Sequence, residues 1–225
     1  MLKSLFLSIF ILVLPNYTYA VVQCEPVTYG DGQYGPYNYY DSKNHIKGAG
    51  GVTGGLKNET RITIVTKYHL NSNIVRLTKG QTGTHISGDL DYTLRALPNH
   101  PVALDTISRF EIRQASSPDF KAKQKAMPYS AECYFQRALK IFGYNQPQTY
   151  MLWGLHKYRE KKYQEAIEYF NKAESLGFNS ADLAYYFGLT YLKLGDINKA
   201  QKYSDIAYSM GYQLPGLKKM LESKQ

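Results

Sequence analysis

Two consecutive stretches of sequence decide the fold: residues 147–180 read PQTYMLWGLHKYREKKYQEAIEYFNKAESLGFNS, and residues 181–214 read ADLAYYFGLTYLKLGDINKAQKYSDIAYSMGYQL. When the first stretch is laid over the second, at an offset of 34 residues, small residues coincide at three places. These pairs are Gly154 with Gly188, Ala166 with Ala200, and Ala173 with Ala207. Two antiparallel helices approach each other most closely where the facing side chains are small. The pattern therefore predicts two similar helical hairpins, which turn at residues 161–163 and 195–197.

A period of 34 residues is that of the tetratricopeptide repeat, a pair of antiparallel helices that stacks on its neighbours. Residues 147–214 resemble a protein of this kind. Upstream, Ala131, Phe135 and Ala138 fit the second helix of another repeat, and residues 101–114 are apolar at helical spacing. The sequence thus predicts an all-α fold, a superhelix of about three helical hairpins, with an irregular N-terminal segment that holds a short strand.

The chain divides into three predicted parts. They are a signal peptide at residues 1–20, a Gly/Tyr-rich irregular segment at residues 21–85, and a helical repeat domain at residues 86–225. Within the last part, residues 88–97 resemble an isolated second helix. Three repeats follow, at about 101–146 (with an insertion at 115–128), 147–180 and 181–214. The last predicted part is a capping tail at 215–225, which shields the last hairpin.

The N-terminal segment is rich in turn-forming and aromatic residues. Residues 48–55 read GAGGVTGG, which predicts a loop. Residues 60–67 read TRITIVTK; they are largely β-branched and roughly alternating, which predicts a strand. Exposed tyrosines have an apolar ring and a polar tip, and such residues stack on sugars. Tyr34, Tyr37 and Tyr39 therefore support an alternative function, the binding of cell-wall glycan or another envelope polymer.

The first residues have the layout of a secretory signal. Lys3 precedes an apolar run at residues 5–14, and Thr18-Tyr19-Ala20 places small residues at positions −3 and −1 of a cleavage site. As a helix, this run reaches only about 15 Å, half of a bilayer core. We therefore expect a cleaved signal peptide rather than a membrane anchor, and a periplasmic or secreted protein with no integral membrane span.

The chain has two cysteines, Cys24 and Cys133, and a formal net charge of +9. In an oxidising compartment an even pair predicts a disulfide, the alternative being two free thiols. The basic residues are spread along the chain without a dense block, which favours a solvated surface over a nucleic-acid site. A basic surface is also compatible with contact to anionic envelope surfaces.

The whole mature chain resembles an uncharacterised family of exported tetratricopeptide proteins of Gram-negative bacteria. The residues that carry the resemblance are Cys24, Tyr34-Gly35-Pro36-Tyr37, the run GDLDYTLR at 88–95 leading into Pro98-Asn99-His100, ECYF at 132–135 with Arg137-Ala138, and LPGL at 214–217. The resemblance implies a helical repeat fold in the cell envelope and implies no particular activity.

Resemblance to tetratricopeptide proteins also implies a binding groove lined by the first helix of each repeat. The positions that face such a groove are Gln148, Met151, Leu155, Tyr158, Arg159, Asp182, Tyr185, Leu189, Leu192 and Lys193. An apolar, aromatic face with a basic edge fits a peptide or partner protein of the cell envelope that has hydrophobic anchors and some negative charge. The alternative is that these residues pack against the chain's own residues 24–85.

No group of residues predicts catalysis. Asp89 and Asp91 are two residues apart, which places them on different faces of a helix, and they suit the N-terminal end of a helix dipole. The five histidines show no His-x-x-x-His or His-Glu spacing that predicts a metal. We therefore expect an adaptor or assembly factor rather than an enzyme, with no cofactor and no metal.

Overall fold

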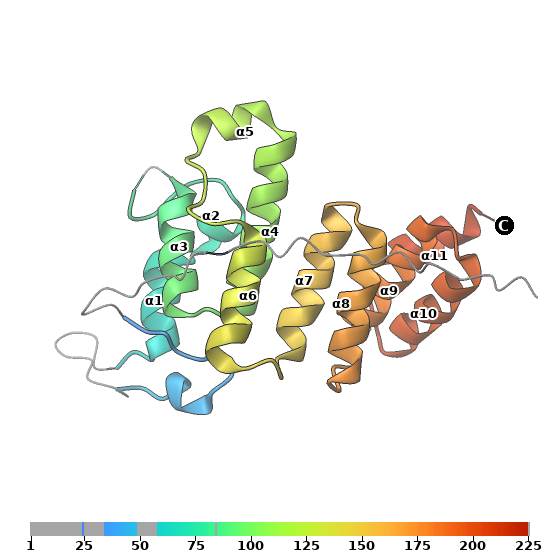
Figure 1. Ribbon diagram of the computed structural model, residues 1–225, viewed down its shortest axis with the longest axis horizontal. Helices are drawn as coiled ribbons and strands as arrows, with labels where there is room; N and C mark the ends of the chain where they lie inside the picture. Colours follow the sequence, from blue (N-terminus) through green and yellow to red (C-terminus); the bar gives the residue numbers. More distant parts are fainter. Residues whose placement is uncertain (1–23, 25–33, 49–57, 84, 225) are drawn as a thin grey trace, which may run out of the picture.

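The computed structural model describes residues 24, 34–48, 58–83 and 85–224, and in this part of the chain every regular element is a helix (Figure 1). The elements are the 3-10 helix η1 Ser42–His45 and the α-helices α1 Arg61–His69, α2 Ser72–Val75, α3 Ile86–Ala96, α4 Pro101–Ser116, α5 Pro118–Lys123, α6 Ala131–Phe142, α7 Pro147–Arg159, α8 Tyr163–Ser175, α9 Ala181–Leu194, α10 Ile197–Ser209 and α11 Gly216–Glu222. The predicted all-α fold of packed helical hairpins is confirmed.

The two hairpins of the 34-residue repeat are α7–α8 and α9–α10, and their small residues lie where the helices meet. The four repeat alanines, Ala166, Ala173, Ala200 and Ala207, expose no surface. A methyl group added at Gly154 would lie 2.5 Å from ring atoms of Phe170, and one added at Gly188 would lie 3.3 Å from the carbonyl oxygen of Ala200. The close helix approach inferred from the sequence is therefore present in both hairpins.

Both hairpins also turn where expected. Lys161 has φ 65° and Gly195 has φ 82°, so each turn contains one residue in the left-handed region. Glycine adopts this region without strain, whereas lysine does so less readily. After these turns α8 begins at Tyr163 and α10 at Ile197.

The prediction of a strand at residues 60–67 is wrong, because this segment forms α1. Thr60 caps the helix: its side chain accepts a hydrogen bond of 2.9 Å from the backbone N–H of Thr63. Ile62 and Val65, three residues apart, are buried, while Ile64 between them is only partly covered. Burial thus follows the helical period rather than the alternation of a strand.

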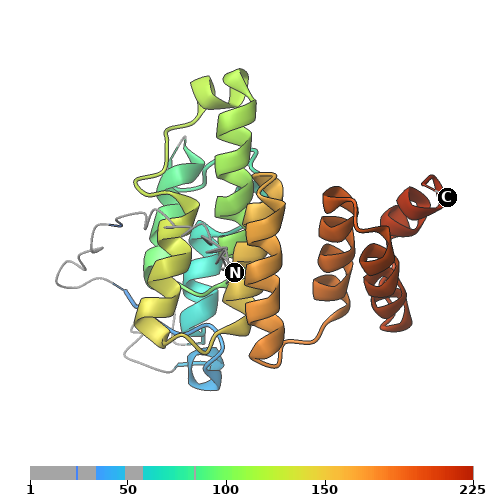
Figure 2. The ribbon, with the colours of Figure 1, turned by 45° about the vertical axis from the view of Figure 1, so that its right-hand side comes forward.

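The region predicted to be irregular also contains helices that belong to the main core. Leu70, Ile74 and Leu77, from α2 and its flanking residues, are buried in the same hydrophobic cluster as Leu104 of α4 and Phe135 of α6. Figures 1 and 2 agree that α1, α2 and α3 lie at one end of the molecule and α11 at the other. A boundary at residue 86 therefore does not separate two cores.

The capping tail is a short helix, α11, whose Leu217 and Leu221 are buried against the last hairpin. The predicted insertion contains α5, which projects at the top of Figure 1. Among the described residues, no helix combines the length and the apolar character that crossing a membrane requires. The predicted signal peptide and the glycine-rich loop at 48–55 lie outside the described residues, apart from Gly48.

Candidate functional site: a tyrosine-lined face

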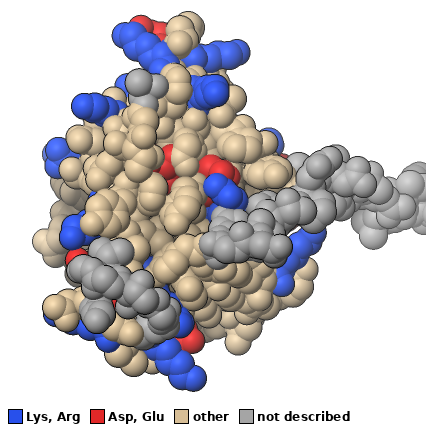
Figure 3. All heavy atoms as spheres, turned by 90° about the vertical axis from the view of Figure 1, so that its left-hand side faces the viewer, with Lys and Arg blue, Asp and Glu red and all other residues tan. Residues whose placement is uncertain are grey.

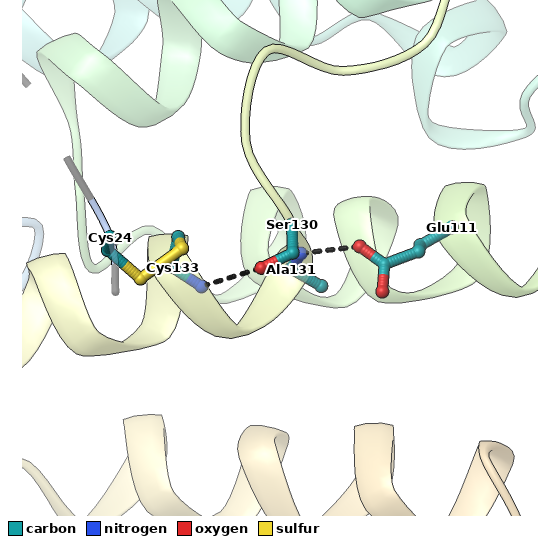
Figure 4. Close-up of a disulfide and its surroundings, with 5 residues drawn as sticks. All are labelled: Cys24, Glu111, Ser130, Ala131 and Cys133. Carbon is teal, nitrogen blue, oxygen red and sulfur yellow. Dashed lines mark hydrogen bonds between the residues drawn. A yellow bond between two sulfur atoms is a disulfide. The ribbon is translucent and has the colours of Figure 1, made fainter. Parts of the chain in front are cut away.

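The predicted disulfide between Cys24 and Cys133 is present, with a Cα–Cα distance of 5.4 Å (Figure 4). Cys133 lies in the first turn of α6, and its backbone N–H donates to the Ser130 hydroxyl over 3.3 Å. The N–H of Ala131 donates to Glu111 of α4 over 2.6 Å. The start of α6 is therefore fixed both to α4 and to residue 24.

The predicted groove positions of the first repeat lie on α7 and are unequally accessible. Met151 and Leu155 are buried in the main core, whereas Gln148, Tyr158 and Arg159 are partly exposed. The guanidinium of Arg159 is already engaged. It donates 2.6 Å to Asp105 and 2.8 Å to the hydroxyl of Ser108, both on α4.

In the second repeat, on α9, Tyr185 and Leu189 are buried, Leu192 is partly exposed, and Asp182 and Lys193 are exposed. Tyr185 and Leu189 share a hydrophobic cluster with Leu217 and Leu221 of α11. These two positions are thus covered by the chain itself, but by its C-terminal tail and not by residues 24–85, which the alternative had named.

The partly exposed positions belong to a continuous series of tyrosine rings, which we call the tyrosine run. Its members, in order of contact, are Tyr163, Tyr158, Tyr186, Tyr185, Tyr212 and Tyr208, with centroid distances of 5.6, 6.4, 5.8, 3.9 and 6.3 Å. Tyr185 is buried and the other five are half-buried. The run connects α7, the start of α8, α9 and the end of α10 with its following turn.

Four members of the tyrosine run are absent from the predicted groove: Tyr163, Tyr186, Tyr208 and Tyr212. Tyr186 was missed because neighbouring helix residues point about 100° apart and only Tyr185 was assigned to the groove. Tyr163, Tyr208 and Tyr212 lie on or after α8 and α10, the second helices of the repeats, whereas the groove was assigned to the first helices. In the fold Tyr185 stacks on Tyr212, while the ring of Tyr186 approaches Tyr158.

The hydroxyl groups of Tyr158 and Tyr186, at the centre of the tyrosine run, are held in the neutral form. Burial raises the pKa of Tyr158, and the neighbouring Tyr163, Tyr185 and Tyr186 raise it further. Burial also raises the pKa of Tyr186, an effect that Arg159 partly offsets. A neutral phenol both donates and accepts a hydrogen bond, so this face can pair with the backbone groups of a bound chain.

The alternative site, Tyr34, Tyr37 and Tyr39, is largely used for packing. These rings lie against the cluster of Ile62, Val65, Ala96 and Leu97. The N–H of Tyr37 donates 2.8 Å to the carbonyl oxygen of Ala96, and the guanidinium of Arg61 lies 4.6 Å from the centre of the Tyr37 ring. A methyl group at Gly35 would lie 2.5 Å from the same carbonyl oxygen, which explains the glycine of the Tyr34-Gly35-Pro36-Tyr37 motif.

The two aspartates considered for catalysis have structural partners. Asp89 lies in the first turn of α3 and accepts 2.7 Å from the N–H of Gln81 and 3.0 Å from His69. Asp91 accepts 2.6 Å from the hydroxyl of Tyr134 and 2.9 Å from Arg95. They point to different neighbours, as their spacing predicts.

Charged residues on the face shown in Figure 3 are dispersed. Most Lys and Arg side chains lie around its edges, with several at the top, and one basic patch lies near the centre beside acidic atoms.

Comparison of the chain with protein-family models, with curated proteins and with solved structures finds no match.

Proposed function

We propose that this protein is an exported interaction module of the tetratricopeptide type, an adaptor or assembly factor of the bacterial cell envelope. In this proposal a peptide segment of a partner protein binds along the tyrosine run. The observation that carries it is the contact series Tyr163–Tyr158–Tyr186, half-buried and next to exposed Asp182. Tyrosine contributes large contact area at low entropic cost and is enriched among the residues that dominate binding energy.

The charged residues near the tyrosine run bear on the charge that a partner peptide should carry. Arg159 is paired with Asp105. Of the two basic residues predicted at the edge of the groove, the exposed one is Lys193. Asp182 is close enough to influence the ionisation of Tyr186 and Tyr212. The ligand that fits best is an extended or helical peptide with aromatic or aliphatic anchors and a charge of either sign at one end.

A peptide selection tests this proposal. The oxidised protein is immobilised, random peptides are selected on it, and the affinity of the enriched peptides is measured by fluorescence anisotropy. Replacing Tyr158 and Tyr186 together by serine is expected to weaken binding at least tenfold, equivalent to about 1.4 kcal/mol. Both side chains are only half-buried, so the variant should keep its helical circular dichroism.

The matched control is Tyr144→Ser, which removes a tyrosine that is 63% exposed and lies between α6 and α7, away from the tyrosine run. It should bind like the wild type. Failure to enrich any peptide, or equal affinity of the double variant and the wild type, contradicts the proposed site.

Export is tested separately. Expression of the full chain in a Gram-negative host should give a mature protein in the periplasm or medium that begins at Val21, as measured by mass spectrometry. Recovery of the uncleaved chain in the cytoplasm refutes the export part of the proposal and leaves the peptide-binding part unaffected.

A further inference from the structure

A group of acidic side chains converges between α4, α6, α7 and α8, away from the tyrosine run. Its members are Glu111 of α4, Glu132 of α6, Glu160 at the end of α7 and Glu165 of α8, together with Lys157 and His156 of α7. All four carboxylates are partly buried, with side-chain exposures of 35, 16, 21 and 32%. Four carboxyl groups in so small a space call for compensating positive charge.

Lys157 supplies only part of that charge. Its ammonium group, 5% exposed, contacts Glu132 directly and lies 2.9 Å from Glu165 and 3.5 Å from Glu160. Lys162 adds a partner for Glu160 at 3.1 Å. Burial, together with the nearby Glu160 and Glu132, raises the pKa of Glu111.

His156 points an unused nitrogen into this acidic group. The ring is fully buried, and its Nδ1 lies 3.1 Å from the hydroxyl of Ser108. Its Nε2 has no hydrogen-bond partner among the described residues; the nearest carboxylate oxygens are Oε2 of Glu160 at 3.7 Å and Oε1 of Glu111 at 3.9 Å. Oε2 of Glu160 likewise lacks a hydrogen bond. The Lys157 ammonium lies 3.5 Å from this oxygen, so the atom without a partner is the buried Nε2 nitrogen of His156. Such a nitrogen is costly unless something occupies the space between it and the two carboxylates.

We propose that Glu111, His156 and Glu160 form a binding site for a divalent transition-metal ion of the zinc class. The three ligand atoms lie within 4.8 Å of one another. Metal–ligand bonds of about 2.1 Å in a tetrahedral complex place the ligand atoms roughly 3.4 Å apart. The two His156 contacts, at 3.7 and 3.9 Å, therefore need to close by about 0.3 and 0.5 Å, and the two carboxylate oxygens, which lie within 4.8 Å of each other, by up to about 1.4 Å.

The donor set distinguishes between metals. One imidazole nitrogen and two carboxylate oxygens, with a fourth position left for water, is an arrangement that zinc accepts. Calcium and magnesium prefer six or more oxygen ligands, which this group of side chains does not provide around one point.

Each proposed ligand is also held by a second contact through its other polar atom. The Ser108 hydroxyl at Nδ1 of His156 itself accepts 2.8 Å from Arg159. Oε2 of Glu111 accepts from the N–H of Ala131, and Oε1 of Glu160 contacts Lys162. Contacts of this kind fix the ring orientation and the carboxylate direction before a metal arrives.

The proposed ligands do not follow either of the two spacings considered in the sequence, His-x-x-x-His and His-Glu. His156 and Glu160 are four residues apart on α7, which puts both side chains on one face of the helix. Glu111 is 45 residues earlier in the chain, so only the packing of α4 on α7 completes the group.

Metal titration of the oxidised, chelator-treated full chain tests this proposal. Isothermal titration calorimetry with Zn²⁺ should show one saturable site, and Co²⁺ should give the intense visible absorption of a low-coordinate complex, which Zn²⁺ then abolishes. Glu160→Gln and Glu111→Gln keep the shape of each side chain and should weaken Zn²⁺ binding at least tenfold. Glu165→Gln alters a carboxylate of the same group that is not a ligand and should change the affinity less than threefold.

A second measurement separates ligand loss from misfolding. At one fixed Zn²⁺ concentration the thermal unfolding temperature should rise equally for the wild type and Glu165→Gln, and clearly less for Glu160→Gln. The proposal is overturned if the wild type shows no saturable binding, or if Glu160→Gln and Glu111→Gln bind as tightly as the wild type. Since the tyrosine run shares none of these three residues, either result leaves the peptide-binding proposal unchanged.

Discussion

Adding one methyl group at the centre of the first repeat hairpin should destabilise the protein measurably. In Gly154→Ala the new carbon would lie 2.5 Å from two ring carbons of Phe170, whereas apolar carbons pack at about 3.5–4.0 Å. Phe170 is fully buried, and its ring contacts Phe187 at a centroid distance of 5.4 Å. The ring therefore has to move by about 1 Å against a neighbour that is also fully buried.

The expected magnitude follows from two opposing effects. Overpacking of a tight core costs typically 1–3 kcal/mol, and a buried aromatic ring belongs near the upper end. Replacing glycine by alanine within a helix gains about 1 kcal/mol. The net loss for Gly154→Ala is thus about 2 kcal/mol, or roughly 4–8 °C in the unfolding temperature of a protein of this size.

The matched control is Gly88→Ala in α3, where an added methyl group meets nothing within 4 Å. This variant keeps the helical gain without the clash and should be more stable than the wild type by up to about 1 kcal/mol. Urea unfolding monitored by circular dichroism measures both, with an unchanged slope showing that stability alone has changed. If Gly154→Ala is as stable as the wild type, the close approach of α7 and α8 does not depend on glycine and the reasoning fails.

Three further predictions concern other parts of the molecule. Cys133→Ser removes the bond that closes a sequence separation of 109 residues and should cost about 2–5 kcal/mol in urea unfolding. Burial lowers the pKa of His100 to about 4, so between about pH 6.5 and 4 the unfolded chain binds a proton that the folded chain does not, and acidification from pH 7 to 4.5 should cost roughly 2–3 kcal/mol through this residue, in addition to the loss through His156, whose pKa burial also lowers to about 4. Leu217→Ala should cost about 2–5 kcal/mol and expose Tyr185 and Leu189, which the binding of a hydrophobic dye can report.

Each of these has a distinguishing control. Reductant should lower the stability of the wild type to that of Cys133→Ser and leave the variant unchanged. His100→Asn keeps a side-chain acceptor for the N–H of Ala103 at the start of α4 but removes the titrating ring, so its stability should fall less on acidification. Met210→Ala, at a side chain that is 41% exposed, should cost much less than Leu217→Ala; equal losses would show that α11 does not pack as described.

The hairpins could be predicted from the sequence because each small residue and the small residue 34 positions later meet the same requirement, the close approach of the two helices of one hairpin. The segment at residues 60–67 could not be assigned by β-branched composition alone, because Ile62 and Val65 fit one face of a helix as well as Ile62 and Ile64 fit one face of a strand. Two contacts favour the helix over the strand. The Thr60 hydroxyl caps the start of the helix, and Ile62 and Val65 pack together on Ala96 and Leu97.

The candidate site was only partly predictable for a different reason. Positions such as Tyr158 and Lys193 follow from the repeat register, since register determines which way a helix residue points. Whether such a position is open depends on segments outside the repeat: α11 covers Tyr185, and α4 engages Arg159. Neither contact leaves a signal in the spacing of the repeat itself.

The disulfide has a consequence for the order in which the chain can be assembled. Translation proceeds from the N-terminus, so Cys24 is synthesised long before Cys133. The Cys24 thiol must therefore stay free until the intervening chain, which includes α1 to α5, has been made; the two cysteines are 109 positions apart. The hairpins α7–α8 and α9–α10 lie outside that intervening chain. The disulfide therefore constrains the N-terminal half directly, whereas the repeats that carry most of the tyrosine run are linked to it only through the hydrophobic core that both halves share.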